Sequence, residues 1–410
     1  MKTYFFHFLA VVFLLTLNLT ACKKAANSPF EEDAKTLAKA FKDKDAQTIN
    51  DFLDYNRLIA QVTQDVDAPA DYAKDFAQNF EQTFNVGEIL TNPMYGERQY
   101  DFVHMKNDSV AFFREENNEG LNYVEFTFGK NADQKTVLRN FYSYMSGESF
   151  TDNLRRMYIM RLADEIDTFS NPYTDAIPQV MEVVKVAQNG DYKTAYNMLD
   201  SLPEVLQTDR MAMLMRLNLG HAIDPATEAD AMAAMRKKLG DDWMIDFKNM
   251  QMHLADSTLN TALKGIDDFD KKIGGDPYLN LMRSIVYQEH KDTTKALEYS
   301  LKTLKSLPDN KIASIQTVAI YLGQNNFDKA AELFQQYKTK FDENLADIFA
   351  PTTYPEFYAS EVGKKWLEEN PTQMPSLPDD YNLEELLRSL NADSLMQEEA
   401  HDHSDPNHQH

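Results

Sequence analysis

The sequence predicts a mainly α-helical chain in which an N-terminal α+β domain is followed by a solenoid of helical hairpins. Two patterns predict this fold class. Apolar residues recur at every third and fourth position over most of the chain, but they alternate with a period of two between residues 100 and 145. Beyond this region alanine recurs at intervals of 34, 33, 34 and 34 residues, at Ala195, Ala229, Ala262, Ala296 and Ala330. A repeat of this length is typical of stacked two-helix units.

The first 29 residues have the pattern of an export signal followed by a tether. Lys2 precedes an apolar run from Tyr4 to Leu17, and Leu19-Thr20-Ala21-Cys22 follows. A basic start, a short apolar core and a small-residue cleavage site predict a secretory signal over residues 1–21 rather than a membrane span. The tetrapeptide resembles the lipobox of bacterial lipoproteins. This resemblance implies cleavage before Cys22, lipid attachment to its thiol and a tether over residues 22–29; an uncleaved anchor or a chance cysteine is the alternative.

The charge and the cysteine content of the chain limit which partners and which thiol chemistry we expect. The formal net charge is −24, which disfavours nucleic acid and anionic lipid surfaces as partners. Cys22 is the single cysteine, so we expect neither an intrachain disulfide nor thiol catalysis. Lys23 stands where an aspartate would signal retention in the inner membrane of enterobacteria. The lipoprotein resemblance therefore implies the outer membrane, on its periplasmic or surface face, with the lipid on Cys22 as the membrane contact.

Residues 30–148 are predicted to form an α+β domain of three helices followed by a four-stranded antiparallel sheet. Helical spacing of apolar residues begins near residues 34, 49 and 73. Period-two patterns and turn residues then predict strands over 100–105, 110–114, 121–128 and 136–145. This order of elements is similar to the cystatin-like cone fold of the nuclear transport factor and ketosteroid isomerase superfamily. The resemblance implies that the domain could bind a small ligand or transfer a proton, with the repeats as a docking platform.

One face of the predicted sheet carries polar and aromatic side chains. They are Tyr123, Glu125, Asn140, Tyr142 and Tyr144, with His104 nearby in sequence. A ligand site or proton transfer at this face is one hypothesis. The other is that the tyrosines pack on the pleated surface while Glu125 points to solvent. No catalytic pair is fixed by spacing, so we assign no catalytic residue or cofactor, and we expect a chain that is not an enzyme.

Residues 150–171 are predicted to form a connecting helix capped by Thr151, and residues 172–342 the repeat array. The alanine ladder resembles the tetratricopeptide repeat, since Tyr321, Phe327 and Phe334 lie at that family's distances from Ala330. The middle units depart from the pattern, with Gly220 and His253 where a tyrosine is expected. The resemblance implies five repeats whose concave surface binds a peptide or protein partner in the cell envelope.

In that family the first helix of each repeat lines the concave surface. The positions transferred to this sequence are Met211, Leu214, Asn218, Met244, Phe247, Gln251, Tyr278, Leu281, Ile285 and Gln288. They are mostly apolar and include methionines, which suit adaptable binding surfaces. The alternative is that these side chains pack neighbouring repeats or are covered by the C-terminal segment. No row of lysines and arginines accompanies them, so recognition of an acidic chain end is not expected.

The C-terminal part of the chain is predicted to cap the repeat array and then to continue as a segment outside it. Residues 343–371 are expected to form a capping helix over its last apolar face. Residues 372–410 are predicted to contain a proline-bearing link, a short amphipathic helix and an acidic disordered tail with histidines. The histidines are His401, His403, His408 and His410. Zinc or copper binding is one interpretation and a solvated tail the other, so no metal site is assigned.

Overall fold

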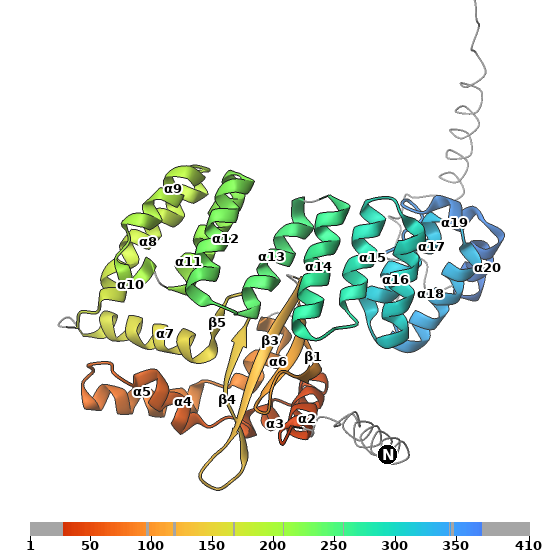
Figure 1. Ribbon diagram of the computed structural model, residues 1–410. Helices are drawn as coiled ribbons and strands as arrows, with labels where there is room; N and C mark the ends of the chain where they lie inside the picture. Colours follow the sequence, from red (N-terminus) through yellow and green to blue (C-terminus); the bar gives the residue numbers. More distant parts are fainter. Residues whose placement is uncertain are drawn as a thin grey trace, which may run out of the picture. The chain divides into compact units, whose positions relative to one another are not determined.

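A computed structural model shows the fold of the chain (Figure 1). It describes residues 28–95, 98–117, 120–166, 169–207, 209–256, 258–343, 345 and 348–370. These fall into two compact units, Met1–Lys248 and Asn249–His410. The expected signal peptide with Cys22 and the expected tail beyond residue 370 lie outside the described residues. Within the described ranges, no helix is both long enough and apolar enough to cross a membrane.

The predicted fold class is confirmed, because an N-terminal region with an antiparallel sheet precedes a series of helical hairpins. Within the described residues the sheet has five strands where four were expected, and five α-helices precede it where three were expected. These helices are α2 (Glu31–Lys42), α3 (Ala46–Asp51), α4 (Tyr55–Thr63), α5 (Ala70–Thr83) and α6 (Val86–Thr91), followed by the 3-10 turn η1 (Pro93–Tyr95).

Side-chain caps explain the additional helices. Asp45 accepts a hydrogen bond from the Thr48 amide, and Asp54 accepts one from the Arg57 amide. Each bond satisfies an amide that the first turn of a helix leaves unpaired. The apolar pattern that predicted one helix after residue 45 is therefore divided into α3 and α4. Asn85 caps α6 in the same way.

The sheet is an antiparallel meander in the order β1-β2-β3-β4-β5. The strands are β1 (Arg98–Met105), β2 (Val110–Asn117), β3 (Gly120–Lys130), β4 (Thr136–Ser143) and β5 (Glu148–Ser149). Phe112 pairs with Glu125, and Glu125 pairs with Tyr142. Residues directly opposite one another point to the same face of a sheet. These pairings therefore define one face, which we call the tyrosine face.

The opposite face of the sheet holds the core of the N-terminal region. Phe113, Val124 and Phe126 pack there with Leu37 and Phe41 of α2. The Phe41 and Phe126 ring centroids are 5.6 Å apart, and those of Phe113 and Phe126 are 4.9 Å apart. Burial of such large apolar side chains stabilises the domain by about 2 kcal/mol each relative to exposure.

Six further α-helices and one 3-10 turn complete the described part of the first unit before α13. They are α7 (Phe150–Glu165), α8 (Pro172–Gln188), α9 (Tyr192–Met198) with the 3-10 turn η2 (Leu199–Ser201), α10 (Glu204–Gln207), α11 (Arg210–Ile223) and α12 (Pro225–Leu239). The N-cap of α7 is Ser149 rather than Thr151, because Ser149 and Asp152 form a capping box. Ser149 also belongs to β5, so the chain passes from sheet to helix without a loop.

Helix α13 (Trp243–Asp256) begins in the first unit and continues into the second. The second unit then contains α14 (Leu259–Ile273), α15 (Leu279–Glu289), α16 (Thr293–Ser306), α17 (Lys311–Gly323), α18 (Phe327–Phe341), α19 (Pro355–Ala359) and α20 (Glu361–Glu369). The expected capping helix is two helices, because the Ser360 hydroxyl accepts from the Gly363 amide and starts α20 anew. Trp366 of α20 packs against Phe334, with centroids 5.1 Å apart.

The alanine ladder marks the second helix of each hairpin, with one exception in its packing. Ala195, Ala262, Ala296 and Ala330 are buried. Ala229 lies in α12 but is exposed, and Ala231 is buried instead. In this hairpin the close approach comes from Gly220 of α11, whose missing Cβ would stand 3.1 Å from the Thr227 carbonyl oxygen. The glycine that broke the repeat pattern therefore takes the role of the small residue.

Candidate functional site

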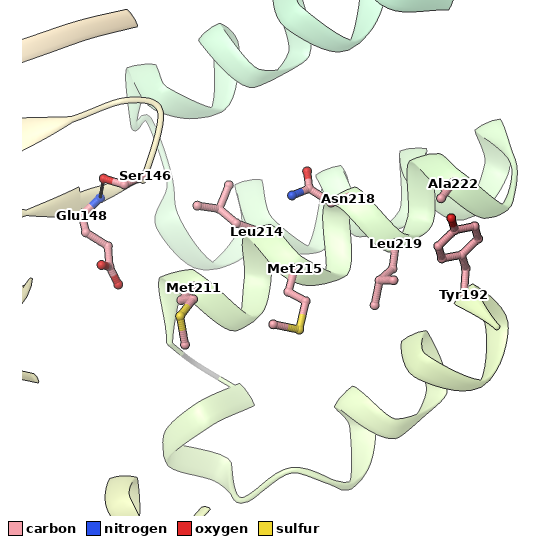
Figure 2. Close-up of a pocket in the computed structure, with 9 residues that line it drawn as sticks. All are labelled: Ser146, Glu148, Tyr192, Met211, Leu214, Met215, Asn218, Leu219 and Ala222. Carbon is pink, nitrogen blue, oxygen red and sulfur yellow. Dashed lines mark hydrogen bonds between the residues drawn. The ribbon is translucent and has the colours of Figure 1, made fainter. Parts of the chain in front are cut away.

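The candidate site is an open groove of about 550 Å³ along α11 in the first unit (Figure 2). One wall is a face of α11, and the ends are formed by the turn between β4 and β5 and by the start of α9. The lining residues are Ser146, Glu148, Tyr192, Met211, Leu214, Met215, Asn218, Leu219 and Ala222. The lining is predominantly apolar, which is typical of ligand and peptide sites.

Helix α11 presents this face because of its start and its spacing. Asp209 caps the helix by accepting from the Met211 amide at 2.9 Å. Met211, Met215 and Leu219 then follow one another at intervals of four residues and lie on one side of the helix. Leu219 is buried against α8 and α9, whereas the two methionines are only partly covered. Partly covered methionines adapt readily to the shape of a bound side chain.

The turn between β4 and β5 is pressed against α11. Gly147 sits in this turn with φ +67°, a conformation that favours glycine. A Cβ atom on Gly147 would stand 2.9 Å from Cδ1 of Leu214 and 3.3 Å from Cε of Met244. Gly147, which lies in the sheet region of the sequence, therefore packs at one end of the groove against the helix that forms its wall.

The acidic residue in the lining is neutralised by the chain itself. Glu148 is buried, and its Oε2 accepts from Arg156 of α7 at 2.9 Å, while its Oε1 accepts a second bond from the same guanidinium. Such a two-point pair fixes both the charge and the orientation of the carboxylate. Asp209 also lies 3.6 Å from Arg156. Glu148 thus shapes the groove but leaves no uncompensated charge within it.

Two uncharged polar groups remain available. Within the part of the chain that the structure describes, neither the Asn218 amide nor the Tyr192 hydroxyl makes a hydrogen bond. Both side chains are exposed. An amide both donates and accepts, and so does a phenol. These are the groups that a peptide backbone requires from an otherwise apolar groove.

A polar cluster joins α11, α13 and the sheet. Arg210, the first residue of α11, donates to Tyr142 of β4 at 2.5 Å and to Asp242 Oδ2 at 2.6 Å. The Tyr142 hydroxyl donates to the same carboxylate oxygen at 3.1 Å. Asp242 Oδ1 accepts from the Met244 amide at 3.0 Å and so helps to start α13. Burial and, next, the Asp242 carboxylate raise the pKa of Tyr142 well above its usual value.

The tyrosine face is covered by the N-terminal part of α13. Phe247 packs edge-on against Tyr123, with centroids 5.7 Å apart, and Trp243 packs against Phe112 at the same separation. Glu125 accepts from the Tyr144 hydroxyl and from Lys106, each at 2.5 Å. Burial and then Glu125 raise the pKa of Tyr144. The expectation that Glu125 points to open solvent is therefore corrected, because its carboxylate is held between two donors.

Asn140 and His104, which were expected near Glu125, lie on the tyrosine face and have partners of their own. Asn140 pairs with Thr127, next to the Glu125 and Tyr142 pair, and its amide donates to Thr151 of α7 at 2.7 Å. His104 stacks on Phe112, with centroids 5.4 Å apart. Tyr123 and Tyr144 are fully buried. The arrangement therefore anchors a helix on a sheet through aromatic packing and buried hydrogen bonds.

The ten residues expected on a partner surface fall into three groups: some line the groove, some are buried and the rest are partly exposed. Met211, Leu214 and Asn218 line the groove. Met244 and Phe247 are fully buried against the N-terminal region, so they are removed from an open surface. Tyr278 and Leu281 are likewise buried in the second unit. The alternative interpretation, that first-helix residues pack within the chain, accounts for these four.

The other three expected residues are partly exposed in the second unit. They are Gln251, Ile285 and Gln288. Gln288 accepts a hydrogen bond from Gln316 at 2.5 Å, which links α15 to α17. Conversely, six residues line the groove without having been predicted: Ser146, Glu148, Tyr192, Met215, Leu219 and Ala222. Met215, Leu219 and Ala222 lie on the same helix as Met211, at positions that helical spacing could have indicated, whereas the other three reach the groove only through tertiary contacts.

No group of histidine, cysteine and carboxylate side chains within the described ranges is arranged to hold a metal ion. No protein-family model matches the chain, and no curated protein matches it.

Two solved structures are similar to parts of the chain. One is PilW, a widely conserved type IV pilus biogenesis factor, at 14% identity and a TM-score of 0.32, over 53% of this chain and 100% of that one. The other is a tetratricopeptide repeat protein from Parabacteroides merdae, at 12% identity and a TM-score of 0.34, over 56% of this chain and 94% of that one. Likenesses of this size identify no ligand or partner.

Proposed function

We propose that the chain is a lipid-anchored scaffold of the bacterial cell envelope whose groove along α11 binds an extended apolar segment of another protein. The observation that carries this proposal is the combination of partly exposed Met211, Leu214 and Met215 with two unpaired polar groups in one groove of about 550 Å³. Contiguous apolar surface beside polar groups is typical of protein-binding sites.

The lining favours a peptide backbone over a charged small molecule. Glu148 is paired with Arg156, so the groove has no free charge to hold a carboxylate or a phosphate. Asn218 and Tyr192 offer both donors and acceptors. A backbone carries one donor and one acceptor per residue and therefore matches them, while the side chains of the segment contact the methionines.

The charge of the chain favours a partner with basic residues beside its apolar segment. The net charge is −24, and potentials of opposite sign accelerate association. The same charge disfavours nucleic acid.

Membrane attachment rests on the N-terminal pattern. The run Tyr4–Leu17 and the tetrapeptide ending at Cys22 fit a lipoprotein signal, and several acyl chains carried by one cysteine residue anchor a protein stably. We propose the outer membrane as the site of anchoring. Ligand binding or proton transfer at the tyrosine face receives no support from the geometry, because Tyr144 and Lys106 occupy the Glu125 carboxylate and α13 covers the aromatic rings.

Photocrosslinking in the native envelope tests the groove. A photoreactive amino acid replaces Asn218 in one variant and Met181 in a control, because Met181 is 60% exposed on α8 and lies outside the groove lining. We expect a discrete protein adduct from position 218 that is lost when Leu214→Asp is added to the same chain. Identical adducts from both positions, or an adduct at position 218 that Leu214→Asp leaves unchanged, would contradict the proposal.

A further inference from the structure

A second groove, of about 360 Å³, lies between α5 and α7 in the first unit. It is separate from the groove along α11 and shares no lining residue with it. Its lining residues are Phe76, Asn79, Phe80, Phe84, Leu154, Met157, Met160, Arg161 and Asp164. The volume lies at the lower end of the range of small-molecule sites, about 300–1,000 Å³.

The two helices that form this groove run antiparallel (Figure 1). The ring of Phe84, at the end of α5, lies 6.2 Å from that of Phe150, at the start of α7. Near the other end, the rings of Tyr72 and Tyr158 are 5.8 Å apart. The groove therefore has a direction, from an aromatic end near Phe84 to a polar end near the last turn of α7.

The aromatic end and the middle of the groove are apolar. Phe76 and Phe80 stack with centroids 5.8 Å apart, and Phe80 stacks on Phe84 at 4.6 Å. The opposite wall carries Met157 and Met160, which are 56% and 42% exposed. The two methionines are three residues apart on α7 and therefore neighbours on its surface, and their exposure leaves a flexible apolar wall available to a ligand.

The polar end carries one carboxylate without a partner. Arg161 is paired with Glu165 through Nε and Oε1 at 2.7 Å. Asp164 also lines the groove, and among the described residues its carboxylate makes no hydrogen bond or ion pair, although its charge acts on the nearby Tyr72. The compensated pair and the free carboxylate together give this end a net negative charge. A cationic group is therefore the complementary ligand group.

Two buried hydroxyl groups belong to tyrosines that pack beside the groove without lining it. The Tyr72 and Tyr158 hydroxyls are buried and have no hydrogen-bond partner in the described part of the chain. Burial and, next, the Glu165 carboxylate raise the pKa of Tyr72, and its ring lies 5.8 Å from that of Tyr158 on α7. Buried hydroxyls without partners are rare in native proteins, so each one requires a physical explanation. Tyr158 packs against the lining residue Phe76, with ring centroids 4.6 Å apart, so one of these hydroxyls belongs to a ring that supports the wall of the groove.

We propose that the groove between α5 and α7 binds a single-chain amphiphile with an ammonium head group, such as lysophosphatidylethanolamine. The acyl chain lies along Phe76, Phe80 and Phe84 against the two methionines. The ammonium group lies on Asp164, and the phosphate of such a head group faces Arg161. A fatty acid lacks the ammonium group and brings a second negative charge to Asp164, so it is disfavoured.

A lysophosphatidylethanolamine with a photoreactive diazirine on its acyl chain tests this proposal on the full chain. We expect saturable labelling of peptides from α5 and α7, and competition by unlabelled lysophosphatidylethanolamine. Lysophosphatidylglycerol with the same acyl chain lacks the ammonium group and should compete at least about fivefold more weakly, the equivalent of about 1 kcal/mol. Labelling elsewhere, or equal competition by the two lipids, overturns the proposal.

Two substitutions test separately the part of the groove that binds the acyl chain and the part that binds the head group. Met157→Asp places a charge against the acyl chain and should reduce labelling of α5 and α7 about tenfold or more. Asp164→Asn should remove the preference for the ammonium lipid while keeping the labelling site. Met181→Asp is the matched control, because Met181 is equally exposed but outside the groove, and it should change neither. Undiminished labelling of Met157→Asp overturns the proposal, independently of the groove along α11.

Discussion

The Tyr142 hydroxyl donates a hydrogen bond to Oδ2 of Asp242 at 3.1 Å, so strand β4 is joined directly to the residue that starts α13. Arg210 binds both partners, which brings the first residue of α11 into the same contact. The sheet and the helix that carries the binding groove therefore share one partly buried polar cluster.

Removal of this hydroxyl should loosen the first unit. Tyr142→Phe deletes the bonds to Asp242 and from Arg210 but keeps the ring, so we expect a loss of about 1–3 kcal/mol in the free energy of unfolding. Urea denaturation followed by circular dichroism measures it. Tyr192→Phe is the control, because the Tyr192 hydroxyl is exposed and without a hydrogen bond in the described ranges, and it should change the free energy by less than ~0.5 kcal/mol. Equal effects of the two substitutions would contradict a structural role for the cluster.

Alkaline pH should destabilise the chain through Tyr144. Burial and Glu125 raise the pKa of Tyr144 in the folded state above the value of about 10 that an unfolded tyrosine has. The folded state thus holds this proton more tightly, and its contribution to stability is complete below pH ~10 and is lost as the pH rises further. Unfolding free energies measured between about pH 9 and 11 should fall more steeply for the natural chain than for Tyr144→Phe. Parallel pH profiles would show that the hydroxyl titrates normally.

Gly147 should be intolerant of a side chain for two separable reasons. Its φ of +67° disfavours any L-residue by about 1–2 kcal/mol, and a Cβ atom would meet Leu214 at 2.9 Å. Gly190→Ala is the matched control, since Gly190 has φ +84° but no atom within 4 Å of the added Cβ. Thermal denaturation should show that Gly147→Ala lowers the melting temperature more than Gly190→Ala. Equal shifts in melting temperature would mean that the turn moves to accommodate the added Cβ atom, so that this end of the groove is not rigid.

The buried pair of Glu148 and Arg156 should matter far more than an exposed pair on the same helix. Arg156→Gln leaves the buried carboxylate without its cation, which typically costs about 3–5 kcal/mol. Arg161→Gln breaks the exposed pair with Glu165 and should change stability by less than ~1 kcal/mol. Urea denaturation of both variants tests the contrast. A small effect of Arg156→Gln would mean that water or another group takes over the Glu148 carboxylate.

Cys22 should determine where the protein is found. Cys22→Ser removes the thiol that lipid attachment requires, so we expect the protein to move from the membrane fraction to the soluble fraction of the envelope, with a mass free of acyl chains. Cell fractionation and intact-protein mass spectrometry measure both changes. Ala21→Gly keeps a small residue before the cysteine and serves as the control, which should remain in the membrane fraction. Membrane retention of Cys22→Ser would favour an uncleaved anchor instead.

The groove shows where sequence patterns are sufficient and where they are not. Met211, Leu214 and Asn218 were expected on a partner surface from the resemblance to the tetratricopeptide repeat, and all three line the groove. Met244 and Phe247 have the same kind of spacing but are buried, because the tyrosine face of the sheet covers the start of α13. An apolar helix face looks identical in sequence whether its partner is another protein or a distant part of its own chain.

The amino-acid sequence by itself determined the fold class, the region of the chain that contains four of the five strands, and the period of the helical hairpins. These depend on local spacing of apolar residues and on turn and capping residues, which can be identified along the chain. Only the tertiary structure decided that α13 packs on the sheet, that Glu148 is neutralised by Arg156, and that Gly147 closes the groove at Leu214. Each of these contacts joins residues far apart in sequence, and its energy depends on a distance that no local pattern encodes.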